Sequence, residues 1–525
     1  MFEIRDVDLA GRIGRLKTKS GVIETPYLFP VVDPTLRKQP IEPSKLKDIG
    51  FPGIITNAYI FMKTRRGSVE DIHKALNFSG VIMTDSGAYQ ILQYGEIEVS
   101  NRDIVEYQCK IGSDIGVILD IPTRYEDPRE RVEYSVRETL RRAYEVLDIV
   151  ESCKSTLWVL PIQGGVHFDL LRYSAEESCK LDSYAILGLG SPTTLLETFQ
   201  LNKVVEMVGI VRSIVPPSKP LHLFGAGHPL IIPFVVALGV DLMDSASYVL
   251  YARDGRYITR RGTYRLDELS YLPCSCPVCS RYSVEELLEL DEETRTKLLA
   301  EHNLHVLMEE LRWVKQAIKE GRLWEYLEER AHSHPAARRA FEVVKRFLPL
   351  IMRYSPKTKP NVYAYEILST DSLHNPKVLY ARMYSQRLEI SKSRIVLIPM
   401  LHTDKPAKTS SITSIISRSI DLENAELYVY TPFLGVFSID ISDVFPFSQF
   451  ESKNVFNDVE LEDLVYVLYE FIDKNIRKGI ASIEIVLCSD IEWNRKVVEM
   501  LFEIFSDVRA YVKVYEIKCT SPTYT

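Results

Sequence analysis

The chain has 525 residues, of which 46% are hydrophobic and 26% charged, as in an ordinary globular protein. A chain of this length is too long to fold around a single hydrophobic core, which indicates roughly two to four domains. The N-terminus shows no signal-peptide pattern, and no uncharged run reaches the roughly 18 residues of a membrane helix, so we expect a cytoplasmic protein. The net charge of −8 excludes a globally basic nucleic-acid-binding protein, so any RNA contact must come from local patches.

Short apolar runs, separated by amphipathic stretches, recur after an N-terminal segment that we expect to form a β-hairpin. This alternation predicts a parallel sheet covered on both faces by helices. Eight runs within about 245 residues fit a closed (β/α)8 TIM barrel, and an open doubly wound sheet is the alternative. The predicted strands are Tyr27–Val32, Gly53–Thr56, Val81–Thr84, Ile115–Leu119, Leu157–Ile162, Tyr184–Leu187, Leu221–Phe224 and Val240–Met243.

Polar or glycine-rich residues directly follow strand after strand. In a barrel the active site is built from the loops at the carboxyl ends of the strands, so these residues are expected to meet there. For any one position, the alternative is that Gly or Asp only ends a strand and caps the next helix. The residues in question are Asp85, Asp120, Gln163-Gly-Gly165, Gly188-Leu189-Gly190, Gly225 to Pro229, and Asp244.

The segment after the last predicted strand is basic. It carries Arg253, Arg256, Arg260, Arg261 and Arg265, interleaved with two tyrosines. Arginine with aromatic residues suits phosphate contact and base stacking, which makes this segment a candidate RNA-binding surface. A solvated basic loop is the alternative.

Eight cysteines are too few for a disulfide framework, and three of them lie within six positions. Cys274, Cys276 and Cys279, followed by His302, supply the four ligands of a closed tetrahedral site, which predicts one structural zinc ion in a reducing compartment. His305, about one turn further along a predicted helix over residues 293–323, is the competing ligand.

The catalytic region is predicted to span residues 1–350, with the zinc-binding insertion at 274–302. A proline-rich linker follows at 349–360. Strand-like runs such as Ser393–Pro399 and Ala425–Tyr430 then mix with helices, which predicts a smaller α+β C-terminal region over 361–525, in one or two units. Cys488 and Cys519 in this region are expected to be buried or incidental.

At these residues the chain resembles the tRNA-guanine transglycosylases, and among them the archaeal branch that serves archaeosine biosynthesis. The resemblance covers about the first 350 residues, and the glycines at 188–190 depart from the family's usual pocket strand. The chain also ends near the point where long archaeal members continue into an RNA-binding PUA domain. The matching pieces are Asp85-Ser-Gly with Gln90, Asp120, Gln163-Gly-Gly165, Phe224 to Pro229, Gly239 to Tyr248, the three clustered cysteines, and His302-Asn-Leu304.

The resemblance implies replacement of guanine-15 in the D-arm of tRNA by 7-cyano-7-deazaguanine through a covalent ribosyl-enzyme. Asp244 is expected to be the nucleophile and Asp85 the proton-transferring group, although the two roles could be reversed. Asp120, Gln163 and the backbone N–H groups of Gly188, Leu189 and Gly190 are expected to bind the base. The implied partners are tRNA, guanine, 7-cyano-7-deazaguanine, a second copy of the chain in a homodimer, and a separate PUA-domain protein.

Three alternative functions differ in class. They are a catalytically silent relative that only binds RNA, an archaeosine-forming amidotransferase relative, and a zinc-stabilised barrel hydrolase. Each would be expected to lack part of the full set of acidic residues, metal ligands and purine-pocket residues. The chain keeps Asp85, Asp244 and all four metal ligands, which favours the transglycosylase.

Overall fold

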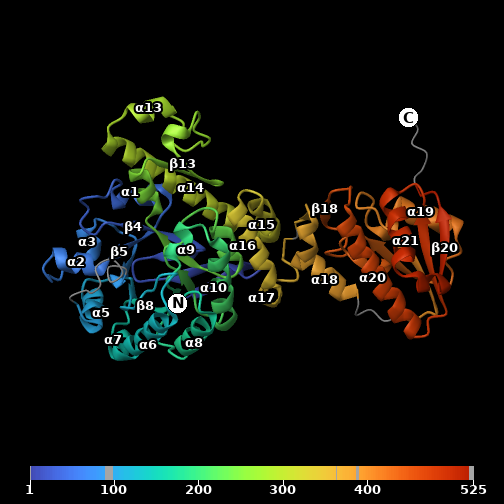
Figure 1. Cartoon of the computed structure of the whole chain (residues 1–525), viewed down its shortest axis with the longest axis horizontal. Helices are drawn as coiled ribbons and strands as arrows, with labels where there is room; N and C mark the ends of the chain where they lie inside the picture. Colours follow the sequence, from blue (N-terminus) through green and yellow to red (C-terminus); the bar gives the residue numbers. More distant parts are fainter. Residues whose placement is uncertain (1, 89–98, 362, 386–389, 520–525) are drawn as a thin grey trace. The chain divides into compact units, whose positions relative to one another are not determined.

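The computed structural model describes residues 2–88, 99–361, 363–385 and 390–519, and the chain divides into two compact units (Figure 1). The first unit contains Met1–Lys319 and Glu329–Ser355. The second contains Glu320–Glu328 and Pro356–Thr525. Residues 320–328, which the predicted boundary at 350 placed with the catalytic region, therefore pack with the second unit.

Eight parallel strands of the first unit close into a barrel, which confirms the predicted TIM barrel and excludes the open sheet. Around the barrel the order is β10-β11-β4-β5-β6-β7-β8-β9. All eight predicted strands are present, and the largest displacements, two residues at each end, are those of β9 and β11. The bounds are β4 Tyr27–Val32, β5 Gly53–Asn57, β6 Val81–Asp85, β7 Ile115–Val117, β8 Leu157–Ile162, β9 Ile186–Leu189, β10 Leu221–Leu223 and β11 Leu242–Ser245.

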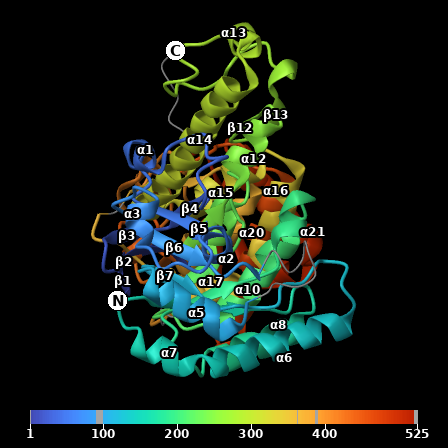
Figure 2. The same cartoon turned by 90° about the vertical axis from the view of Figure 1, so that its left-hand side faces the viewer.

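The strands are almost wholly buried because helices cover the outside of the barrel while side chains fill its interior. Figure 2 shows α5, α6 and α8 outside the strands. The helices between the barrel strands are α1 Pro43–Ile49, α2 Ala58–Thr64, α3 Ile72–Ala75, α5 Asn101–Lys110, α6 Arg129–Glu145, α7 Leu147–Ser152, α8 Phe168–Ser178, α9 Thr193–Glu197, α10 Leu201–Ile214 and α11 Ile232–Ala237.

The N-terminal segment forms three antiparallel strands instead of the expected hairpin: β1 Phe2–Asp8, β2 Gly11–Lys17 and β3 Val22–Thr25. A buried ion cluster ties β2 to the amino-terminal end of the barrel. Arg12 donates to Asp241 at 2.9 Å, and Arg212 donates to the same carboxylate at 3.2 Å. The three side chains are nearly inaccessible to solvent, so this cluster is part of the framework of the unit.

A lobe follows the barrel and leads into long helices. It begins with α12 Ser247–Arg253 and the antiparallel pair β12 Arg256–Thr259 and β13 Gly262–Arg265. After α13 Val284–Glu289 comes α14 Glu292–Glu320, which agrees with the helix predicted around His302. The remaining helices are α15 Leu323–Ala331, α16 Pro335–Arg346 and α17 Leu348–Tyr354.

The second unit is built on a five-stranded sheet of order β17-β16-β15-β19-β20. Three of its four pairings are parallel, which refines the expectation of a mixed α+β region. The strands β14 and β18 form a separate two-stranded parallel sheet. The bounds are β14 Tyr365–Ile367, α18 Pro376–Ser385, β15 Arg394–Pro399, α19 Ser411–Ser419, β16 Glu426–Thr431, β17 Gly435–Ser438, β18 Phe450–Ser452, α20 Asp458–Arg477, β19 Ser482–Cys488, α21 Glu492–Ile504 and β20 Val512–Ile517.

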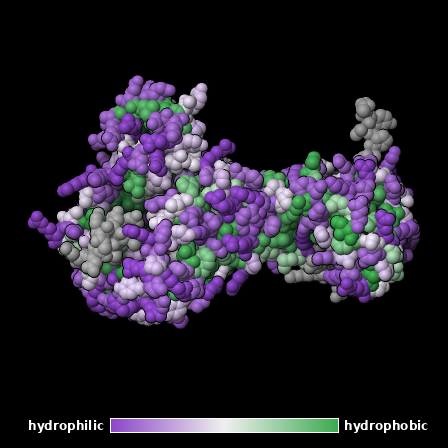
Figure 3. All heavy atoms as spheres, viewed as in Figure 1, coloured by the Kyte–Doolittle hydropathy of each residue, from purple (hydrophilic) through white to green (hydrophobic). Residues whose placement is uncertain are grey.

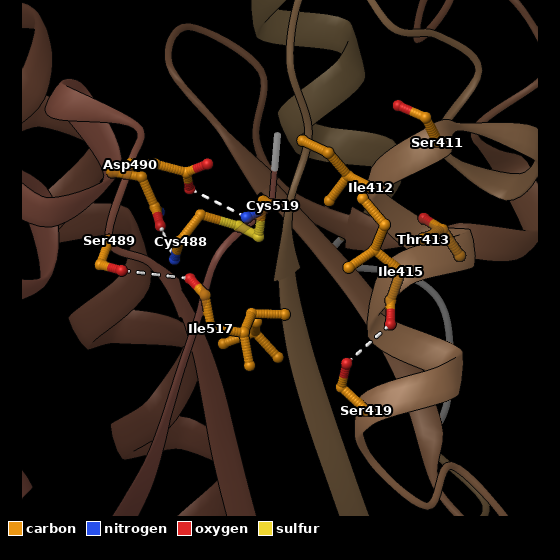
Figure 4. The surroundings of a disulfide bond; sticks show 12 residues. Ser411, Ile412, Thr413, Ile415, Ser419, Cys488, Ser489, Asp490, Ile517 and Cys519 are labelled. Carbon is orange, nitrogen blue, oxygen red and sulfur yellow. Dashed lines mark hydrogen bonds between the residues drawn. A yellow bond between two sulfur atoms is a disulfide. The ribbon is translucent and has the colours of Figure 1, made fainter. Parts of the chain in front are cut away.

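The structure contains two disulfides, neither of which the sequence analysis predicted. Cys109 is bonded to Cys153, and Cys488 to Cys519. Figure 4 shows the second bond, where the backbone N–H of Cys519 donates to Asp490 at 2.9 Å. Cys488 and Cys519 are thus buried, as expected, but they are not incidental, because they link the end of β19 to the segment after β20.

The face of the molecule drawn in Figure 3 is mostly hydrophilic, with hydrophobic residues in separate patches. Among the described residues, no helix combines the length and the apolar composition needed to span a membrane.

Candidate functional site

A cavity of about 670 Å³ opens at the carboxyl-terminal ends of the barrel strands. Asp85 ends β6, Asp120 lies three residues after β7, and Asp244 lies in β11. All three carboxylates line the cavity. The structure therefore brings together the three acidic residues that the sequence placed at separate strand ends, in a space large enough for a purine with its ribose.

Asp244 is held through one of its two oxygens. Its Oδ1 lies 2.8 Å from Nε2 of His222 and accepts the backbone N–H of Gly225 at 3.1 Å. Gly225 has a φ of 70°, a left-handed conformation that glycine adopts without strain. Within the described part of the chain, Oδ2 has no hydrogen-bond partner, so this oxygen is the one available to a substrate.

The ionised form of Asp85 is repelled by both of the other carboxylates in the cavity. Its Oδ2 accepts from Nδ2 of Asn57 and from the backbone N–H of Gly87, both at 3.3 Å. Loss of solvation in the cavity, followed by repulsion from Asp120 and Asp244, raises the pKa of Asp85 to about 7. A carboxyl group with a pKa near neutrality can both give and accept a proton at physiological pH.

Asp120 is bound to Gln163, whose Nε2 donates to its Oδ2. Burial raises the pKa of Asp120 to about 6, and the bond from Gln163 partly offsets this rise. The hydroxyl of Ser191 accepts the N–H of Thr123 at 2.9 Å and donates to Oε1 of Gln163 at 2.6 Å. Because Oε1 is occupied in this way, the amide nitrogen of Gln163 faces Asp120.

The expectation that residues 188–190 offer backbone donors is corrected by the structure. Gly188 and Leu189 lie within β9, hydrogen-bonded between two neighbouring strands, and neither lines the cavity. Gly190 does line it, but its N–H donates to the carbonyl of Ile162 at 3.0 Å. A Cβ at this glycine would lie 2.4 Å from Nε2 of Gln163, so Gly190 is needed to leave room for that amide.

The four predicted metal ligands come together in the lobe after the barrel. The Sγ atoms of Cys274, Cys276 and Cys279 and a ring nitrogen of His302 all lie within 4.8 Å of one another. Nδ1 of His302 is 3.5 Å from Sγ of Cys276 and 3.3 Å from Sγ of Cys279. A tetrahedral zinc ion separates such ligand atoms by roughly 3.6–3.8 Å, so the set fits the ion.

The surroundings of His302 favour it over His305 as the ligand. His302 is buried, and its Nε2 donates to the carbonyl of Ile258 at 2.9 Å, which leaves Nδ1 for a metal. The ring of Tyr257 stacks on it with centroids 3.7 Å apart. Among the described residues, the structure places His302, and not His305, beside the three cysteines.

The five arginines proposed for RNA contact differ in their surroundings. Arg253, Arg256, Arg261 and Arg265 are exposed along α12 and the β12–β13 hairpin. Arg260 is instead bound to the fully buried Glu310 at 3.1 Å, so its guanidinium serves to hold the hairpin on α14. Leu250 and Tyr251, in the same helix as Arg253, line the cavity, which places this surface at the rim.

Sequence reasoning missed three side chains of the site. Asn57 supports Asp85, Ser191 orients Gln163, and His222 holds Asp244. The only sequence signal for Asn57 was its place directly after a predicted strand, and the only one for Ser191 was its place directly after Gly190. His222 had no such signal, because it lies inside an apolar run. Gln90, which is part of the family resemblance, lies outside the described residues.

Comparison with known proteins agrees with this arrangement. The sequence model of the TGT family, described as queuine tRNA-ribosyltransferase, matches residues 7–336. A protein of Sulfolobus acidocaldarius named tRNA-guanine(15) transglycosylase is 42% identical over 491 residues, covering 93% of this chain and 96% of the relative. One of Aeropyrum pernix with the same name is 43% identical over 510 residues, covering 95% and 97%.

A longer relative of the same name, from Pyrococcus furiosus, is 44% identical over 397 residues, covering 75% of this chain and 66% of the relative. The family match spans more than half of the chain and includes all the cavity carboxylates and the metal cluster. The chain therefore belongs to the queuine tRNA-ribosyltransferase, or tRNA-guanine transglycosylase, family.

Proposed function

We propose that the protein is a tRNA-guanine(15) transglycosylase that replaces guanine-15 of tRNA with 7-cyano-7-deazaguanine. The observation that carries the proposal is the convergence of Asp85, Asp120 and Asp244 on one cavity at the carboxyl end of the barrel. The names of relatives that align with nearly the whole chain support the choice of substrate. Base exchange at this position would serve archaeosine biosynthesis.

The reaction would proceed by two displacements at C1′ of the ribose. Oδ2 of Asp244 attacks C1′, and the bond from C1′ to N9 breaks, so that guanine leaves with the electron pair and receives a proton from Asp85. The incoming base then loses its N9 proton to Asp85, and its N9 displaces the carboxylate. Asp85 thus ends in the protonation state in which it began, which its pKa of about 7 permits.

Base recognition would fall to Asp120 and Gln163. Guanine presents N1–H and a 2-amino group as donors, which a carboxylate accepts together, and O6 as an acceptor for an amide N–H. Gln163 lines the cavity and already donates from its amide nitrogen to Asp120. The nucleotide must leave its stack to enter, and the four exposed arginines of the rim would hold the neighbouring phosphates.

Cys274, Cys276, Cys279 and His302 would hold one zinc ion. Four protein ligands leave no open coordination position, so the ion would stabilise the lobe that carries the arginines and take no part in the chemistry. The homodimer and the separate PUA-domain protein stay predictions of the family resemblance.

The test measures incorporation of radiolabelled guanine into a tRNA transcript with guanine at position 15. The protein should incorporate label into this transcript and not into one with adenine there, and unlabelled 7-cyano-7-deazaguanine should compete. Asp244→Ala should abolish incorporation without unfolding the protein. Equal labelling of both transcripts, or full activity of Asp244→Ala, would show that the proposed reaction is wrong.

A further inference from the structure

We propose that His222 is a positioning residue that selects which oxygen of Asp244 attacks the ribose. The inference rests on the proposed function, in which Asp244 is the nucleophile. His222 touches neither the cavity nor, on this account, the substrate, and it acts only through the Asp244 carboxylate.

The sheet register brings the two residues together. His222 lies in β10 opposite Leu242 of β11, two residues before Asp244. On the other side its partner in β9 is Gly188, where a Cβ would lie 2.6 Å from the ring of Phe224. The absence of a side chain at residue 188 therefore leaves room for Phe224, whose ring lies 4.5 Å from that of His222 between centroids.

The tautomer of His222 follows from its contacts. Its side chain is fully buried, and Nδ1 has no hydrogen-bond partner among the described residues. Nε2 lies 2.8 Å from Oδ1 of Asp244, which can only accept when the carboxylate is ionised. Nε2 must therefore carry the proton that it donates to Oδ1.

Two donors then converge on one oxygen. Nε2–H of His222 and the N–H of Gly225 both bind Oδ1, so this oxygen is fixed and Oδ2 is turned toward the cavity. In the covalent intermediate Oδ2 would be bonded to C1′ and Oδ1 would become the carbonyl oxygen of the ester, still bound by the same donors. When the incoming base displaces Oδ2, the electron pair of the C1′–O bond returns to the carboxylate, whose charge these donors stabilise.

Three substitutions separate this role from simple packing. His222→Phe keeps the ring and removes the donor, His222→Gln places an amide N–H near the position of Nε2, and His222→Asn carries the same amide one bond too short. We expect kcat for guanine exchange to fall about 100-fold in the Phe and Asn variants, because a misplaced nucleophile or a lost donor has effects of this size. The Gln variant should recover most of the loss, and KM for tRNA should change little in all three.

His73→Gln is the matched control, because His73 also pairs with an aspartate of the barrel. Its Nε2 lies 3.2 Å from Oδ2 of Asp114, a residue that precedes β7 at the opposite end of the barrel. This variant should keep the wild-type kcat. Melting temperatures show which variants are folded, and the Gln and Asn pair decides the question if His222→Phe does not fold.

A wild-type kcat in His222→Asn or His222→Phe, or equal losses in folded Gln and Asn variants, would overturn the role of His222. These results leave the proposed function intact if Asp244→Ala is inactive. Full exchange by Asp244→Ala would instead overturn the proposed function and the inference about His222 together.

Discussion

Asp85 has the most strongly perturbed carboxyl group in the cavity, and its protonation should be visible in the stability of the protein. Its pKa of about 7 lies above the ordinary value of 3.8, so the folded protein binds more protons than the unfolded chain between these pH values. The contribution of Asp85 to folding stability therefore falls as pH rises from about 4 to 7, and its full destabilising effect is present above pH 7.

Replacing Asp85 with asparagine should remove this cost. Asp85→Asn is expected to raise the free energy of unfolding at pH 8 by on the order of a few kcal/mol, and by much less at pH 5, while abolishing guanine exchange. Thermal or denaturant unfolding of both proteins at the two pH values checks this. Equal effects of the substitution at pH 5 and pH 8 would contradict a raised pKa.

Ser191 should affect recognition of the base more than the chemical step. Ser191→Ala removes the bond that orients Gln163, so KM for 7-cyano-7-deazaguanine should rise about three- to tenfold, as expected for one hydrogen bond, with kcat nearly unchanged. Ser191 also has a φ of 62°, which glycine tolerates without strain. Ser191→Gly is therefore the control, and a normal KM in this variant would show that the backbone, not the hydroxyl, matters.

At the level of residues, the sequence predicted the groups that end strands and missed those that support them. Asp85, Asp120, Gln163 and Asp244 stood out because a polar residue followed an apolar run. His222 lies between two leucines in β10, and nothing in that pattern indicates that its ring meets a carboxylate of the next strand. Such a contact depends on the register of the barrel, which the sequence alone does not supply.

At the level of elements, continuous apolar runs were a reliable signal because parallel barrel strands are buried on both faces. The predicted bounds of β4 and β8 agree with the structure. The prediction for β9 ended two residues too early because Gly188 was taken as the end of the strand. The structure shows that this glycine belongs to β9 and makes room for Phe224.

The lobe after the barrel should depend on its metal. Cys276→Ser removes one of four ligands, so we expect less than one zinc ion per chain, a lower melting temperature and reduced exchange activity. Cys179 is a free cysteine outside the cluster, and Cys179→Ser is the control that should keep one ion per chain. Carefully purified wild-type protein without zinc, as measured by elemental analysis, would contradict the prediction.

At the level of the whole molecule, the strands β15 and β16 were recognisable in the sequence, but the disulfides were not. The first part of the segment predicted as a linker, 349–360, lies in α17. The paired cysteines are 44 and 31 residues apart, and such distances carry no signal without knowledge of which elements pack together. The mostly parallel sheet of the second unit was not predicted either. Its parallel pairings join strands that are distant in sequence, such as β15 and β19.

The proposed reaction depends on a covalent bond between the protein and the ribose of tRNA. The most direct test is to trap the complex of protein and tRNA under denaturing conditions, digest both, and locate the ribosyl group by tandem mass spectrometry. We expect a ribose ester on the peptide that contains Asp244, and no such ester in Asp244→Ala. An adduct on Asp85, or an adduct that persists in Asp244→Ala, would contradict the assignment of Asp244 as the nucleophile.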